Sequence, residues 1–290
     1  MERDLKALIT LLDDNDTEVY NHVFNKLLSY GPEIIPTLEH VWSDTFNPDM
    51  HDRLEVLIHS IQFEGLYRDF ENYCKQGVFD LLKGASLIAR YAYPEFKSED
   101  LQADISRIKR EIWLELNYSL TPLEQINVMN QVFFNNLGFG IDHVQHLDES
   151  DFYINKLIES KKAHPILVGL LYTVLARKLD FPVYGLNLPN HFALTFCRPS
   201  RLAHFPDADD QRLHVIFYIN PQNKGSIFTK NEIDEYLSKM EIETKAKYYE
   251  PCSDQTIIRL LLKNLLNFYQ DKQDALRISE LSRLYALFKK

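Results

Sequence analysis

The stretch from Lys161 to Phe196 constrains the fold more than any other part of the chain. Its first half is an apolar run with a proline near the start, which predicts a buried helix over residues 165–179. Two shorter segments follow, separated by a tight polar turn. They predict strands over 182–188 and 191–197, the second opening with His191. We therefore expect a buried helix packed on a small antiparallel sheet at the centre of the fold.

Helical patterns precede this core. Apolar residues spaced three and four apart predict four short helices within the first 62 residues, and two more over 77–92 and 98–116. Thr121, Pro122 and Glu124 form a capping-box start for a further helix. The first helices have short connections, which is typical of HEAT-like stacking, but no fixed repeat period is present and a plain helical bundle is the alternative.

The segments after the core complete the expected architecture. The sequence LHVIFYIN predicts a strand over 213–220, and Thr229 with Glu232 predicts a helix over 230–239. Ser253 is suited to cap a long helix, and a last amphipathic helix covers 272–288. The order of elements predicts an α+β protein that is mostly helical and ends in an antiparallel helix pair.

We expect three packed parts. A helical N-terminal region occupies residues 1–140, the core with the sheet occupies 141–240, and a C-terminal helical hairpin packed on the core occupies 241–290. No change of composition along the chain marks a flexible linker between these parts.

The charge and hydropathy of the chain exclude some classes of function. The formal net charge of −10 argues against a broad nucleic-acid surface, which needs clustered Lys and Arg. No apolar run approaches the roughly 18–20 residues of a transmembrane helix. The start, MERDLKALITLLDDND, lacks the basic region and cleavage site of a signal peptide. We expect a cytoplasmic protein that binds neither nucleic acid nor membrane.

Neither a metal nor a cofactor is expected. The three cysteines, Cys74, Cys197 and Cys252, are far apart, form no CxxC pair and are best interpreted as reduced thiols. His143 and His146 have a spacing that suits metal ligands on one helical face, but no cysteine or carboxylate pair completes the set. We interpret them as residues of a solvated loop.

Three segments carry a resemblance to a known family. They are HPILVGLLYTVLARKLDFPVYGLNLPNHFALTF, FYINPQNKG and IIRLLLKNLLNFY. In them a helix ending in A-R-x-L-x-x-P-V is followed by P-x-H-F and later by N-P-x-x-x-G. This combination resembles the bacterial transglutaminase-like family, in the subgroup with helical additions at both ends. The resemblance covers most of the chain and implies a transglutaminase- or papain-like core.

The resemblance also assigns roles to residues. In such enzymes a cysteine at the N-terminal end of the core helix has its thiol pKa lowered by the helix dipole. A histidine opening the next strand is the base, and an Asp or Asn on the adjacent strand orients it. The base matches His191 and the orienting residue matches Asn220. The nucleophile position falls within Pro165, Ile166 and Leu167, none of which is a nucleophile.

No other cysteine fits the empty position. Cys197 is six residues beyond His191, about 20 Å away on one strand at roughly 3.3 Å per residue. Without the resemblance, His191 is also consistent with a hydrogen-bonded histidine at a strand start, and Asn220 with an ordinary turn residue. His164 is adjacent to the empty position and is a candidate for the same cleft.

Three functions are compatible with this pattern. The first is a non-catalytic transglutaminase-like protein that binds a protein or a small ligand. The second is a divergent hydrolase or acyl-transfer enzyme that uses His191, with His164 as a possible partner. The third is a helical scaffold with an inert core. The sequence leaves the identity of the ligand and the oligomeric state open.

Overall fold

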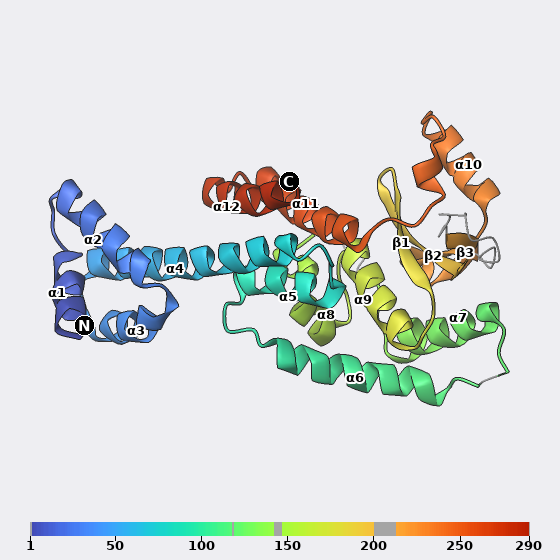
Figure 1. Ribbon diagram of the computed structural model, residues 1–290, viewed down its shortest axis with the longest axis horizontal. Coiled ribbons are helices and arrows are strands. Elements are labelled where there is room, and N and C mark those ends of the chain that lie inside the picture. Colours follow the sequence, from blue (N-terminus) through green and yellow to red (C-terminus); the bar gives the residue numbers. More distant parts are fainter. Residues whose placement is uncertain (1, 118, 142–146, 200–212, 290) are drawn as a thin grey trace, which may run out of the picture. The chain divides into compact units, whose positions relative to one another are not determined.

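The structure is a computed structural model that describes residues 2–117, 119–141, 147–199 and 213–289 (Figure 1). It contains two compact units, Met1–Gln76 and Gly77–Lys290. His143 and His146 lie outside the described residues. The division into parts at 1–140, 141–240 and 241–290 stays a prediction.

The first unit is helical. Its helices are α1 (Glu2–Leu11), α2 (Thr17–Tyr30), α3 (Ile35–Asp44) and α4 (Pro48–Lys75), with a 3-10 turn at Pro32–Ile34 before α3. Their shared core contains the fully buried Leu27, Leu38 and Leu54. Four helices were predicted here. The last continues past its predicted end near residue 62, because apolar residues recur every three or four positions as far as Tyr73.

The second unit holds one antiparallel sheet, in the order β1-β2-β3-β4. The strands are β1 (Val183–Leu188), β2 (His191–Pro199), β3 (Leu213–Asn220) and β4 (Ser226–Phe228). The first three are the predicted strands. The short β4 was missed, because its residues follow the turn signal QNKG and number only three. The predicted α+β, mostly helical fold class is confirmed.

The described part of this unit also contains eight α-helices. They are α5 (Leu81–Ala92), α6 (Ser98–Leu114), α7 (Pro122–Asn130), α8 (Ile154–Ser160), α9 (Pro165–Lys178), α10 (Lys230–Lys239), α11 (Asp254–Lys272) and α12 (Ala275–Ala286). A π-helical turn, Gln131–Asn136, continues α7, and short 3-10 turns cover Glu149–Phe152, Pro221–Asn223, Ala246–Tyr248 and Leu287–Lys289. Both predicted capping boxes, at Thr121 and Thr229, are present. None of the described helices combines the length and apolarity needed to cross a membrane.

Helix α9 is the centre of this unit. Every residue from Ile166 to Ala176 is buried, as expected for a helix that is apolar on all sides. It packs closely on β2 at Gly169, where an added Cβ would lie 2.7 Å from the ring of Phe192. A side chain at this position would therefore push the helix away from the strand.

Helix α11 is fixed against α9 and β1 at its start. Both terminal nitrogens of Arg177 donate to Asp254, at 2.6 and 2.9 Å. The Arg177 Nε also donates to the carbonyl of Val183, and the Cys252 N–H donates to the carbonyl of Gly185. Because Arg177 is near the end of α9 and Asp254 begins α11, α11 runs back toward the start of α9 (Figure 1).

Candidate functional site

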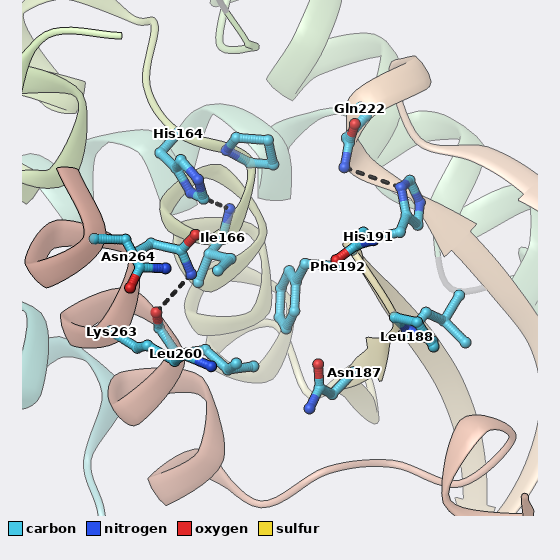
Figure 2. Close-up of a pocket in the computed structure, with 14 residues that line it drawn as sticks. His164, Ile166, Asn187, Leu188, His191, Phe192, Gln222, Leu260, Lys263 and Asn264 are labelled. Carbon is cyan, nitrogen blue, oxygen red and sulfur yellow. Dashed lines mark hydrogen bonds between the residues drawn. The ribbon is translucent and has the colours of Figure 1, made fainter. Parts of the chain in front are cut away.

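A cavity of about 580 Å³ lies where the start of α9, the β1–β2 hairpin and the middle of α11 meet (Figure 2). The hairpin turns through Pro189 and Asn190, and Asn190 has a positive φ of 52°. Pro followed by Asn suits this turn, because Pro fixes the first central residue and Asn tolerates the left-handed conformation at the second. The lining residues are His164, Pro165, Ile166, Asn187, Leu188, Pro189, Asn190, His191, Phe192, Gln222, Leu260, Lys263, Asn264 and Asn267.

Four of the residues singled out from the sequence line this cavity together. They are His164, Pro165, Ile166 and His191. The other two do not line it: Leu167 is fully buried in the core, and Asn220 lies at the end of β3. The helix start and the histidine that opens β2 therefore share one cavity.

The residue that hydrogen-bonds to the His191 ring is Gln222, which sequence reasoning missed. Its Nε2 lies 3.0 Å from Nδ1 of His191 (Figure 2). An amide nitrogen donates, so in this orientation Nδ1 accepts and the neutral ring carries its proton on Nε2. Asn220 contacts the backbone of Gln222 and not the ring, because its Oδ1 accepts from the backbone N–H of Gln222 at 3.0 Å. The motif N-P-Q contains a sequence signal for this contact. An Asn before Pro caps a turn, and the turn projects the side chain of the residue two positions after the Asn.

The loop that carries Gln222 is anchored to α9. Asn130 donates from Nδ2 to the carbonyl of Gly225 at 2.8 Å, and its Oδ1 accepts from the hydroxyl of Tyr172, also at 2.8 Å. The N–H of Gly225 in turn donates to the carbonyl of Asn220 at 2.9 Å. Because Tyr172 belongs to α9, this chain of hydrogen bonds fixes the position of Gln222 relative to the central helix.

His164 caps α9. Its Nδ1 accepts from the N–H of Ile166 at 3.3 Å, and its ring stacks on Phe152 with centroids 5.0 Å apart. Burial lowers the pKa of His164 to about 4, so the ring is neutral at pH 7. Burial also lowers the pKa of His191.

The start of α9 offers no free donor to a ligand. Pro165 has no N–H, and the N–H groups of Leu167 and Val168 both donate to the carbonyl of His164. Ile166 donates to the His164 ring, as described above. A helix start stabilises a thiolate or an oxyanion through such N–H groups, and here they are occupied.

Amide side chains dominate the polar lining. Five of the residues that line the cavity carry amides: Asn187, Asn190, Gln222, Asn264 and Asn267. Lys263 is the one lining residue among those described that carries a full charge at neutral pH, and no carboxylate is in the lining. The site is thus weakly positive in a chain whose net charge is −10.

All three cysteines lie elsewhere, and their thiols are not activated. Burial raises the pKa of Cys74 to about 11 and that of Cys252 to about 12. Cys197 is fully buried beside the hydroxyl of Thr195, and burial raises the pKa of this thiol also. Reactive cysteines show the opposite shift. Among the described residues, no group of three His, Cys, Asp or Glu side chains is arranged to hold a metal ion.

A helix packed on an antiparallel sheet, with a histidine opening the second strand beside the helix start, is the arrangement that the resemblance to transglutaminase-like enzymes implies. The family model of the transglutaminase-like superfamily matches residues 99–263, which is more than half of the chain. The chain belongs to the transglutaminase-like superfamily.

The relatives include UPF0162 proteins and F-box only protein 21. A UPF0162 protein of Xylella fastidiosa (strain 9a5c) is 26% identical over 199 residues, which cover 65% of this chain and 64% of the relative. A UPF0162 protein of Vibrio cholerae is 23% identical, with 70% and 72% covered. The F-box only protein 21 of Mus musculus is 24% identical over 69% of this chain, but the match spans only 32% of that protein. No solved structure matches the chain.

The hydrogen bond between Gln222 and His191 leads to a first prediction. The variant Gln222→Glu places a carboxylate at Nδ1 of His191. The carboxylate accepts a hydrogen bond from a protonated Nδ1 and so favours the charged imidazolium. We expect the pKa of His191 to rise by about 1–2. An NMR titration of the histidine ring protons measures it. The matched control is Asn223→Asp, which adds the same charge on the adjacent, exposed residue. An equal rise in both variants would show that the contact with the ring is not responsible.

Proposed function

We propose that this chain is a non-catalytic member of the superfamily, and that the cavity beside His191 binds a protein segment or a small ligand. The observation that carries the proposal is the start of α9. It presents Pro165 and Ile166 to the cavity, where the resemblance to the enzymes requires a thiol. A covalent acyl step needs a nucleophile at this position.

Two further features support the proposal. The amide of Gln222 faces Nδ1 of His191. With the amide nitrogen as the donor, the ring carries its proton on Nε2, which then donates a hydrogen bond and does not accept a proton. In a catalytic triad the orienting group accepts from Nδ1–H, which leaves Nε2 free as the base. The raised pKa values of Cys74 and Cys252 also argue against an activated thiol elsewhere in the chain.

The test of this proposal combines an activity assay with a thiol assay. Purified protein is incubated with a fluorescent primary amine and a glutamine-rich acceptor protein, and separately with a fluorescent thiol reagent. We expect no amine incorporation by the wild type or by His191→Ala, and slower thiol labelling in the folded than in the urea-unfolded protein. Incorporation or hydrolysis that His191→Ala abolishes would contradict the proposal.

One observation favours a second function, a divergent hydrolase. His164 and His191 line the same cavity, so both can approach one bound molecule. This alternative requires Nε2 of His191 to be unprotonated, with the proton on Nδ1. The ¹⁵N chemical shifts of the His191 ring at pH 7 decide between them, since they separate the two tautomers. A proton on Nδ1 supports the hydrolase, and a proton on Nε2 supports the binding site.

We place the protein in the cytoplasm, with its cysteines reduced. All three cysteines are free in the structure, and they lie at separate positions in the fold. Free thiols persist in reducing compartments.

A further inference from the structure

Strand β1 lies at one edge of the described sheet. Leu188 pairs with His191 across the two-residue turn, and the pairing then alternates along the hairpin. In such a hairpin the closing pair, Leu188 and His191, is hydrogen-bonded. The backbone N–H and C=O groups of Asn187, Gly185 and Val183 therefore point away from β2. Two contacts fit this alternation, because Val183 accepts from Arg177 and Gly185 accepts from Cys252 on that edge.

Asn187 is the next residue on the same edge, and its outward N–H and C=O are available. Among the described residues, neither group makes a hydrogen bond to the rest of the chain. Asn187 also lines the cavity (Figure 2). An edge residue with unpaired backbone groups is a template for another extended chain.

We propose that the cavity binds the C-terminal segment of a polypeptide in an extended conformation. The segment pairs with the outward backbone groups of Asn187, and its terminal carboxylate binds near Lys263. This inference rests on the proposed function, because it names the ligand class of the same cavity.

The blocked edge of β1 explains why a chain end fits better than a continuous chain. Cys252 occupies the edge at Gly185, two residues from Asn187. An added strand therefore cannot continue along β1 past this point and has to end or turn there. Main-chain pairing with a strand edge is a known mode of peptide recognition, and capture of a terminal carboxylate is another.

The charges of the lining explain why the chain end is the C-terminus. Lys263 is positive, and no carboxylate among the lining residues competes for it or repels an incoming anion. The amides of Asn264 and Asn267 lie on the same face of α11 as Lys263. Asn264 donates one N–H to the carbonyl of Leu260 at 2.8 Å, so its oxygen and its second N–H can bond a peptide backbone, and Asn267 can do so through both donors and acceptors. A cavity of about 580 Å³ is in the range of small-ligand sites and has room for only a few residues.

The experiment uses the whole chain of 290 residues and a mixed pool of peptides. The pool contains N-acetylated hexapeptides with randomised residues, half with a free C-terminal carboxylate and half amidated. Peptides retained on immobilised protein are quantified by mass spectrometry. We expect free carboxylates to be enriched about fivefold over amides, as a partly exposed ion pair allows.

Two pairs of variants test the two halves of the proposal. Lys263→Gln should abolish the preference for free carboxylates, whereas Arg259→Gln, which removes the same charge from an exposed position of the same helix outside the cavity, should keep it. Asn187→Pro removes the outward N–H and should weaken retention of both peptide types about tenfold. Asn187→Ala keeps the N–H and should weaken it no more than about twofold. Proline is tolerated where an edge N–H points outward, and circular dichroism checks that each variant folds.

Equal retention of free and amidated peptides overturns the proposal, and so does a preference for free carboxylates that Lys263→Gln leaves unchanged. The comparison of Lys263→Gln with Arg259→Gln remains decisive even if Asn187→Pro fails to fold. If amidated peptides that contain Asp or Glu are retained as well as peptides with a free C-terminal carboxylate, the assignment to a chain terminus is overturned. The same samples are checked for cleaved or modified peptides. Products that depend on His191 contradict the non-catalytic function itself, whatever the binding preference.

Discussion

Replacing Gly225 with alanine is expected to destabilise the unit Gly77–Lys290 through both its backbone conformation and a steric clash. Gly225 has a φ of +74°, and an added Cβ would lie 2.1 Å from Oδ1 of Asn130. The left-handed conformation costs about 1–2 kcal/mol for a residue with a side chain. Displacing Asn130 also removes the acceptor of the buried Tyr172 hydroxyl, which costs about 1–3 kcal/mol. We expect a total loss of roughly 2–5 kcal/mol.

The matched control for this variant is Gly138→Ala. Gly138 has nearly the same φ, +76°, but an added Cβ would have no heavy atom within 4 Å. This control carries only the backbone cost, so the difference between the two variants measures the contact with Asn130. A double variant, Asn130→Ala with Gly225→Ala, should lose little more than Gly225→Ala alone, because Asn130 is already displaced in the single variant. Equal destabilisation by Gly138→Ala and Gly225→Ala would contradict the role given to Asn130.

The measurement is urea unfolding followed by tryptophan fluorescence. The chain has two tryptophans, one in each compact unit, at Trp42 and Trp113. In a Trp42→Phe background the signal comes from Trp113 alone and reports the unit that contains Gly225. A change in the midpoint without a change in slope shows that stability itself has changed.

The sequence was sufficient for the elements whose signals are local. The strand over 213–220 and the capping boxes at Thr121 and Thr229 follow from patterns within a few residues, and each is present. The start of α9 at Pro165 follows from the preference of proline for the first helical position. Where the local signal was short or ambiguous, as at β4, the pattern was not sufficient.

The candidate site depended on contacts that no local pattern contains. Asn220 and Gln222 are two residues apart on one turn, and either side chain suits a contact with a histidine ring. Which of them reaches His191 depends on how the turn is held, and Asn130 holds it from 95 positions away along the chain. The availability of Asn187 likewise depends on where Cys252 crosses the edge of β1. Such long-range placement is the part that sequence reasoning did not supply.

Acidification is expected to destabilise the same unit through His164. Its pKa is about 4 in the folded protein and about 6.5 when unfolded. Between these values the unfolded state binds the additional proton, so stability is fully present above pH 6.5 and is lost as the pH falls toward 4. The loss from this residue amounts to about 3 kcal/mol over that interval. Protonation also removes the lone pair with which Nδ1 caps α9 at Ile166.

The variant His164→Asn isolates this effect. Asparagine is a favoured N-cap residue and does not titrate, so it keeps an acceptor for the N–H of Ile166 at every pH. Urea unfolding at pH 7, 6, 5 and 4.5 in the Trp42→Phe background should show a shallower loss of stability than in the parent. His191, whose pKa is also lowered by burial, accounts for part of the slope that remains. The control His214→Asn, at an exposed position of β3, should keep the parental slope. A pKa of His164 that is lower in the folded than in the unfolded state requires stability to fall as the pH falls. If His164→Asn has the same slope of stability against pH as the parent, the neutral state of His164 does not contribute to folding.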